Sequence, residues 1–202
     1  MSKEGLIIAG AGGHGVSVLD AALSACLFDV LGFLDDWLPD GSMVLGFPVL
    51  CRFERVTDFI GEDMRFVVGL GQIKSPGRRV ELYERISQSG GKMATILAST
   101  AYVSTSASIG LGSVVLHGAV VNARAVVGEN CIVNSMALVE HDAIVGAHSH
   151  VATGARINGS ATVGRESFIG SGAVLIQESF VPDNSVISAG AVILNRYAGE
   201  VR

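Results

Sequence analysis

The chain has few charged and aromatic residues and no long apolar segment. Charged residues make up only 16% of the 202 residues and aromatic residues 6%, whereas 49% are hydrophobic, which excludes a disordered chain. Gly, Ser, Asp or His interrupts every apolar run before it is long enough to span a bilayer, so no membrane-spanning helix is predicted. The mean hydropathy of +0.49 therefore indicates a soluble core of small and aliphatic side chains. A net charge of −5 argues against a nucleic-acid partner.

Cysteine and targeting signals are equally sparse. The three cysteines, Cys26, Cys51 and Cys131, form no CxxC pair and no even-numbered framework, so we expect reduced thiols. The first residues, MSKEGLIIAGAGG, lack the long apolar core and cleavage site of a signal peptide. These features predict a cytoplasmic protein without a membrane partner. The 26 glycines follow no Gly-X-Y period, which excludes collagen.

A six-residue repeat fills the second half of the chain. A small residue (Ala, Ser or Cys) lies four positions after each of the first fifteen members of an aliphatic series, from Ala107 to Ala191. The series itself consists of Val103, Ile109, Val115, Val121, Val127, Val133, Val139, Val145, Val151, Ile157, Val163, Ile169, Leu175, Val181, Ile187 and Ile193.

This period predicts a triangular prism of short strands. Each six-residue unit makes one strand and one turn, and three units close a coil of 18 residues that stacks on the next at roughly 4.8 Å. Gly110, Gly128, Gly146 and Gly164 recur once per coil, where we expect a tight bend or a positive φ. The pattern resembles the hexapeptide-repeat signature of the left-handed parallel β-helix, and the handedness is implied by that resemblance.

The first half has the order of a nucleotide-binding α/β unit. A predicted strand at 5–10 leads into GAGGHG (Gly10, Gly12, Gly13, His14 and Gly15) and a predicted helix at 16–26. A second strand at 30–36 ends in Asp35 and Asp36, about 20 residues after the last glycine, as in dinucleotide-binding folds. Such a turn is often only structural. The unit is too short for a two-halved dinucleotide fold, which favours a nucleotide or nucleotide sugar over NAD.

Further elements complete this Rossmann-like unit. A strand is predicted at 65–71, a helix at 75–90, and the segment 92–97 leads into the prism. We therefore expect two domains, a small α/β nucleotide-sugar-binding domain at 1–98 and a left-handed β-helix at 99–202.

One histidine of the prism has a spacing that suits catalysis. His141 follows an inward aliphatic by two places, so it is expected at a corner, pointing outward. One coil later lies Gly159, which would leave open space and a free N–H beside the imidazole, and Asp142 could orient the ring. The competing interpretation is that polar residues on a solenoid exterior are solvated and inert.

Other chemistry finds little support in the sequence. No reactive serine motif is visible, and Cys131 falls in the inward ladder. His148 and His150 could form a metal pair, but the five-residue histidine spacing of gamma-class carbonic anhydrases is absent. We therefore predict no metal.

Together the two halves resemble the bacterial nucleotide-amino-sugar N-acetyltransferases of the PglD/NeuD type. The resemblance covers nearly the whole chain and rests on GAGGHG and on VEHDAIVGAHSHVATGARINGSATVG. It implies acetyl-CoA as co-substrate, a homotrimer with active sites between subunits, and a nucleotide-linked 4-amino-4,6-dideoxyhexose as acceptor, with GDP-perosamine favoured and a UDP-sugar next.

The resemblance also implies roles for particular residues. His141 and Asp142 take the catalytic positions, the Gly159 N–H holds the acetyl carbonyl, and His150 lies near acetyl-CoA. The nucleotide-sugar-binding positions are Gly10, Gly12, Gly13, His14, Gly15, Asp35 and Asp36. Relatives often carry Glu at the position of Asp142, whose side chain is shorter. They often end in G-x-P-A-[KR], whereas this chain ends LNRYAGEVR, leaving Arg196 or Arg202 as possible phosphate contacts.

The expected reaction is direct attack of the sugar amine on the thioester, with His141 as general base. The alternatives are O-acetylation of a sialic-acid-type sugar, a metal-dependent carbonic anhydrase, and a non-catalytic solenoid that binds a partner.

Overall fold

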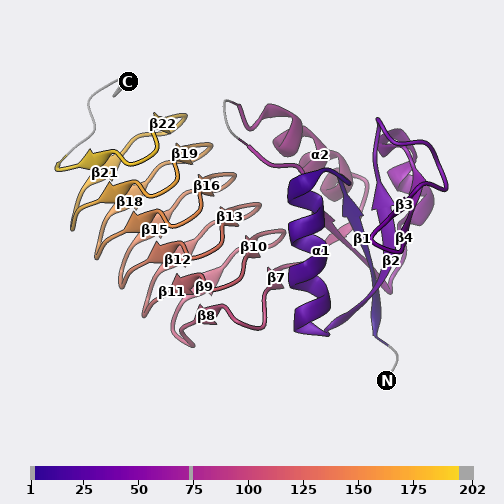
Figure 1. The fold of residues 1–202 in the computed structure, drawn as a ribbon, viewed down its shortest axis with the longest axis horizontal. Coiled ribbons are helices and arrows are strands. Elements are labelled where there is room, and N and C mark those ends of the chain that lie inside the picture. The colour runs from indigo at the N-terminus through magenta and orange to yellow at the C-terminus, as the bar shows by residue number, and fades with distance from the viewer. Residues whose placement is uncertain (1–2, 73–74, 196–202) are drawn as a thin grey trace.

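The computed structural model describes residues 3–72 and 75–195, which form an α/β unit and a triangular prism packed side by side (Figure 1). Arg196 and Arg202 lie outside the described residues, so their proposed phosphate contacts stay predictions. No helix within the described ranges is long and apolar enough to cross a membrane.

The α/β unit contains one six-stranded sheet of order β3-β4-β2-β1-β5-β6, parallel except for β3 against β4. Its elements are β1 (Glu4–Ala9), α1 (Gly13–Ala25), β2 (Phe28–Leu34), β3 (Met43–Val44), β4 (Phe47–Cys51), the 3₁₀ helix η1 (Phe53–Phe59), β5 (Met64–Val68), α2 (Gly77–Gln88) and β6 (Lys92–Met93). The expected strands and both helices are present. The first helix begins earlier than expected, at Gly13, because the glycine-rich turn itself supplies the first helical residues.

The prism consists of short strands, each of which pairs in parallel with the strand one coil further along the chain, as predicted. The strands are β7 (Ile96–Leu97), β8 (Tyr102–Val103), β9 (Ser108–Ile109), β10 (Val114–Val115), β11 (Val120–Val121), β12 (Val126–Val127), β13 (Ile132–Val133), β14 (Leu138–Val139), β15 (Ile144–Val145), β16 (His150–Val151), β17 (Arg156–Ile157), β18 (Thr162–Val163), β19 (Phe168–Ile169), β20 (Val174–Leu175), β21 (Phe180–Val181), β22 (Val186–Ile187) and β23 (Val192–Ile193).

Three parallel sheets form the faces of this left-handed β-helix. The first contains β7, β10, β13, β16, β19 and β22, the second runs from β8 to β23, and the third from β9 to β21. In most strands the second residue points inward, so the predicted aliphatic series lines the core together with the small residues of the turns. Removing these side chains from water drives the coiling.

The glycines that recur once per coil are required for a different reason from a positive φ. None of the four has a left-handed φ. A Cβ on Gly128 would lie 2.6 Å from the Ala147 amide nitrogen of the next coil, and one on Gly146 equally close to the Arg165 nitrogen. Close stacking of the coils therefore excludes a side chain at these corners.

The first face of the prism is turned toward the α/β unit (Figure 1), and its strands β7, β10 and β13 pack against that unit. Helix α1 lies between the sheet and this face, with Val18 and Leu19 buried against Ile96, Val114 and Ile132. Because β7 already pairs with β10, the first rung of the prism forms at Ile96. The boundary between residues 98 and 99 stays a prediction.

A buried arginine joins the two units. Arg79 of α2 is 2% exposed, and its guanidinium donates to the backbone carbonyls of Asn130 and His148 and, at 2.6 Å, to Gln72 Oε1. Burial lowers the pKa of Arg79 to about 10, which leaves it charged at neutral pH. The carbonyls it caps belong to the same corner of the prism in two successive coils.

Replacing Arg79 by leucine should lower the free energy of unfolding by roughly 2–4 kcal/mol, because buried carbonyls lose a charged donor. Urea unfolding followed by circular dichroism measures the change. Arg85→Leu, an exposed position on the same helix, is the matched control and should stay within about 0.5 kcal/mol. Equal stability of the two variants would contradict this role for Arg79.

Candidate active site

His141 lies where the sequence predicted, in an outward corner of the prism. It belongs to the turn between β14 and β15, and its side chain is 54% exposed. Its Nδ1 lies 2.8 Å from Asp142 Oδ2. Because a carboxylate only accepts, Nδ1 donates this hydrogen bond, which leaves Nε2 as the ring nitrogen that can act as a base. Within the described part of the chain, Nε2 has no hydrogen-bond partner, so it is available as a base.

Gly159 packs against this imidazole from the next coil. A Cβ on Gly159 would lie 2.8 Å from both Cε1 and Nε2 of His141, so only glycine leaves the ring in place. The backbone carbonyl oxygen of His141 already accepts a hydrogen bond, from Ser160 N. No acceptor for the Gly159 N–H occurs among residues 3–72 and 75–195. An unpaired backbone donor beside a free base is the arrangement that an oxyanion site requires.

Asp142 has a second partner that the sequence analysis missed. Arg124, one coil earlier, donates from Nε to Asp142 Oδ1 at 2.6 Å and from NH2 to Oδ2 at 2.8 Å. The hydrogen bonds from Arg124 and then from His141 hold the pKa of Asp142 well below its usual range. Subtracting 18 from 142 would have found Arg124. Despite its short arm, Asp142 reaches His141 directly.

The glycine-rich turn forms the second candidate site. Gly12 caps α1 and Gly13 begins it, and a Cβ on either would meet nothing within 4 Å, so the helix N-terminus opens toward solvent. Gly10 and Gly15 serve packing instead, since a Cβ on Gly15 would lie 1.9 Å from the Gly10 carbonyl oxygen. Open backbone N–H groups at a helix N-terminus favour an anion such as a phosphate.

His14 and His150 lie together beneath this turn, with ring centroids 6.3 Å apart. His150 Nδ1 donates to the Gln72 carbonyl at 2.8 Å, so its Nε2 accepts from the Asn134 amide at 3.1 Å. Burial first of all lowers the pKa of His150 to about 4 and that of His14 to about 3. Both rings are neutral at pH 7, and His14 Nε2 has no partner in the described residues.

The two acids after β2 serve different neighbours. Asp35 is 3% exposed and accepts from the backbone nitrogens of Ala11, Trp37 and Leu38, at 2.8–3.0 Å. Its carboxylate therefore ties the glycine-rich turn to the following loop. Asp36 accepts from Phe53 N at 3.1 Å and lies 3.8 Å from the Arg78 guanidinium.

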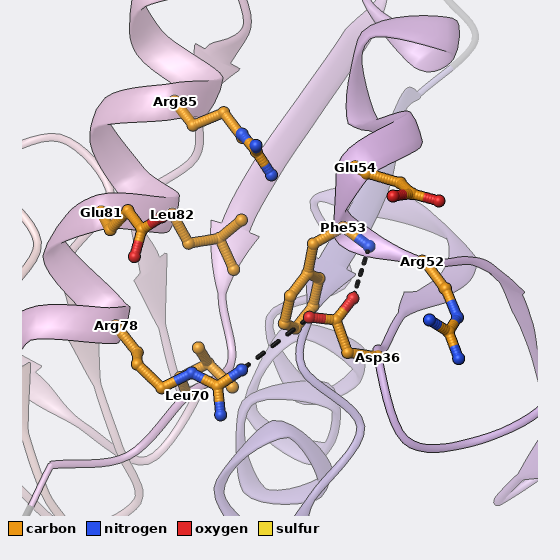
Figure 2. Close-up of a pocket in the computed structure, with 9 residues that line it drawn as sticks. All are labelled: Asp36, Arg52, Phe53, Glu54, Leu70, Arg78, Glu81, Leu82 and Arg85. Atoms are coloured by element: carbon orange, nitrogen blue, oxygen red, sulfur yellow. Dashed lines mark hydrogen bonds and ion pairs between the residues drawn. The ribbon is translucent and has the colours of Figure 1, made fainter.

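Two adjoining pockets open beside these acids. One of about 480 Å³ is lined by the glycine-rich turn, His14, Asp35 and Trp37. The other, of about 300 Å³, lies between η1 and α2 and contains Asp36 and the side chains of Arg52, Arg78 and Arg85 (Figure 2). Leu70 lines both. The first pocket therefore includes the open N-terminus of α1 and the exposed ring of Trp37.

Within one chain the two sites lie on opposite sides of the prism. His141 and Gly159 occupy the corner between the second and third faces, whereas His150 lies on the first face, against the α/β unit. In a single chain His150 therefore lies beside His14 of the glycine-rich turn, on a different face of the prism from Gly159. Its contact with acetyl-CoA stays a prediction that requires a second subunit.

The remaining candidates show no metal geometry. Among the residues that the structure describes, no three His, Cys, Asp or Glu side chains are grouped to hold a metal ion. His148 is buried beside Tyr83 and 3.8 Å from Glu129. Burial raises the pKa of the Cys131 thiol to about 11, as expected for an inert core cysteine.

Comparison with known proteins places this geometry in a family. The PglD N-terminal domain model matches residues 5–86. The acetyltransferase domain of PglB from Neisseria gonorrhoeae FA1090 is 34% identical, with a TM-score of 0.90 over 97% of this chain and 94% of that one. The chain belongs to the PglD-type acetyltransferases. It is accordingly an acyltransferase.

Other PglD-type structures contain ligands. The same PglB domain in complex with acetyl coenzyme A is again 34% identical, with a TM-score of 0.89 over 96% of this chain and 93% of that chain. PerB from Caulobacter crescentus, in complex with CoA and GDP-perosamine, is 27% identical, with a TM-score of 0.87 over 98% of this chain and 92% of that chain. No curated protein sequence matches this chain.

Proposed function

We propose that this PglD-type acetyltransferase transfers the acetyl group of acetyl-CoA to the 4-amino group of a nucleotide-linked 4-amino-4,6-dideoxyhexose, with GDP-perosamine favoured over a UDP-sugar. The observation that carries the proposal is the corner of His141, Asp142 and Gly159, which joins a free imidazole nitrogen to an unpaired N–H. The likeness to PerB, solved with CoA and GDP-perosamine, supports the choice of substrates.

The reaction is a direct transfer within a ternary complex. The amine lone pair forms the C–N bond at the thioester carbon, while His141 Nε2 takes a proton from the nitrogen. The Gly159 N–H donates to the carbonyl oxygen as negative charge develops on it. The C–S bond then breaks, and the imidazolium returns the proton to the thiolate. Asp142 keeps Nδ1 protonated throughout, so the base is always Nε2.

The active site is formed between subunits of a homotrimer. The separation of the His141 corner from the glycine-rich pocket supports this assembly, because one chain cannot bring its own two sites together across the prism. Exposed apolar side chains on the second and third faces, among them Val126, Ile144 and Val192, are available for burial between prisms. The acetyl group would then meet the sugar of a neighbouring subunit.

The nucleotide occupies the pocket at the glycine-rich turn. Gly12 and Gly13 N–H groups bind the diphosphate at the N-terminus of α1, and neutral His14 adds a donor. Asp35 shapes the pocket through its backbone contacts, and Asp36, in the adjoining pocket that shares Leu70, would meet the ribose or base.

Trp37 provides a stacking surface for the base. It is the chain's single tryptophan and is 61% exposed, with the Arg78 guanidinium 4.4 Å from its ring centroid and Phe53 at its edge. Trp37→Leu should raise KM for the nucleotide sugar roughly tenfold or more, as base stacking contributes about 1–3 kcal/mol. Steady-state kinetics measure this, and kcat should stay unchanged.

Fluorescence gives an independent reading of the same contact. Because Trp37 is the single tryptophan of the sequence, tryptophan emission reports on this residue alone. A stacked base of GDP or UDP should therefore quench it. Trp37→Phe retains an aromatic face and should keep KM close to that of the wild type. An unchanged KM in Trp37→Leu, with no quenching in the wild type, would place the base elsewhere.

An acceptor panel tests the function as a whole. Thiol release from acetyl-CoA is measured with GDP-perosamine, UDP-linked 4-amino-4,6-dideoxyhexoses and sialic acids. Turnover of one nucleotide amino sugar is expected and identifies the nucleotide. Turnover of sialic acids alone would show O-acetylation instead. No thiol release with any acceptor, together with no rise in melting temperature on adding acetyl-CoA, would favour a non-catalytic binding module.

A further inference from the structure

Arg124 lies at the same corner of the prism as His141 and Asp142, one coil earlier. Its guanidinium holds both oxygens of Asp142 in a two-point pair, at 2.6 and 2.8 Å. The same Oδ2 that accepts from Arg124 also accepts from His141 Nδ1. The three side chains therefore form one continuous chain of charge-assisted hydrogen bonds that ends at the free Nε2.

We propose that Arg124 is a positioning residue, which holds the Asp142 carboxylate in the orientation that keeps the His141 imidazole beside Gly159. The proposal rests on the function proposed above. Arg124 touches no reacting atom in this arrangement and acts only through Asp142.

Asp142 needs such an anchor because its own surroundings fix it weakly. It is a corner residue with φ +60°, and its side chain is 33% exposed, so packing alone does not restrict its rotamer. One hydrogen bond from His141 leaves the carboxylate free to swing about that contact. A planar fork fixes the plane of the carboxylate as well as its distance, which a lysine ammonium cannot do.

The neighbouring charges do not compete for Arg124. The other acid of this corner, Glu140, accepts from Asn122 Nδ2 at 2.9 Å and from His141 N at 3.1 Å. In the described part of the chain, Asp142 is the one ion-pair partner of Arg124. The Arg124 backbone is itself tied to the preceding coil, since its N–H donates to Ser106 Oγ at 3.2 Å. Among the described residues, Glu140 and Asp142 are the charged groups bonded to His141, and Arg124 is bonded to Asp142.

A double-mutant cycle on the full chain tests the coupling. Arg124→Gln should lower kcat roughly tenfold, the size of coupling seen between members of one hydrogen-bond network, while KM for acetyl-CoA and the melting temperature stay unchanged. Arg124→Lys should recover only part of the loss. Asp142→Asn should remove the benefit of Arg124, so adding Arg124→Gln to it should change kcat by less than about twofold.

Three outcomes would overturn the proposal. Additive losses in the double variant would show that Arg124 acts independently of Asp142. A higher KM for acetyl-CoA in Arg124→Gln would show that the guanidinium binds a coenzyme A phosphate instead. Unchanged kcat in Arg124→Gln would show that Asp142 needs no second anchor. Failure of the proposed function is a separate result, full activity of both His141→Asn and Asp142→Asn, and would not depend on Arg124.

Discussion

Replacing His141 by asparagine is expected to lower kcat by about 100- to 10,000-fold, the usual contribution of a general base. Asparagine occupies similar space but has no basic nitrogen, so the amine proton has no acceptor. KM for acetyl-CoA should change far less, because the imidazole acts on the proton in the transition state. Initial rates of thiol release at saturating substrates measure both values.

Folding must be held constant for this result to be interpreted. The His141 side chain is 54% exposed and packs on a corner, so the variant should keep the wild-type melting temperature. His117→Asn is the matched control, since His117 lies in another corner, bonded to Thr100. It should retain full activity. Full activity of His141→Asn would disprove the base assignment, and a burst phase or a trapped acetylated residue would disprove direct transfer.

The second large effect is expected from a single methyl group. In Gly159→Ala the new Cβ would lie 2.8 Å from Cε1 and Nε2 of His141, closer than such contacts normally come. The imidazole must move away from the acetyl group, and the methyl covers the N–H that would hold the oxyanion. We expect kcat to fall by about 100- to 1,000-fold, as when an oxyanion donor is removed.

Gly61→Ala is the control for the methyl group itself. A Cβ there would make only an ordinary 3.7 Å contact with Met64, and Gly61 lines neither of the two pockets beside the glycine-rich turn. Its activity should equal that of the wild type. If Gly159→Ala also retained wild-type kcat, then neither the ring position nor the Gly159 N–H would be part of catalysis.

The fold was predictable wherever one local period governs the structure. The six-residue aliphatic series predicted the prism, its three-unit coil and its core, and all three are confirmed. The prediction that the corner glycines provide a tight bend or a positive φ was wrong in part. Close contact between successive coils requires glycine at those positions, and not the φ of the residue. Helix α1 begins earlier than predicted because Gly13 of the glycine-rich turn is already its first helical residue.

The candidate site was predictable only where it follows that period. Adding 18 to 141 located Gly159, and the structure places it against the imidazole. The place of His150 depends on how the α/β unit packs against the first face, which no local pattern encodes. The same holds for Arg79, whose partners lie in the other domain. Trp37 carried a weak signal, as a lone aromatic residue after two acids.

The central claim is that His141 of one subunit serves the nucleotide pocket of another. Complementation tests this with His141→Asn and Gly12→Asp, two variants that should each be inactive. Aspartate is a good helix N-cap, and a Cβ at Gly12 meets nothing within 4 Å, so the turn should fold while the carboxylate repels the diphosphate.

Co-expressed in equal amounts, the two chains should form mixed trimers. About one quarter of the sites would then combine an intact His141 with an intact pocket, if closed rings assemble at random. Recovery of about a quarter of the wild-type rate, from two inactive chains, is the result expected for sites shared between subunits. No recovery in trimers shown to contain both chains would mean that each chain builds its own site, and would contradict the assembly proposed.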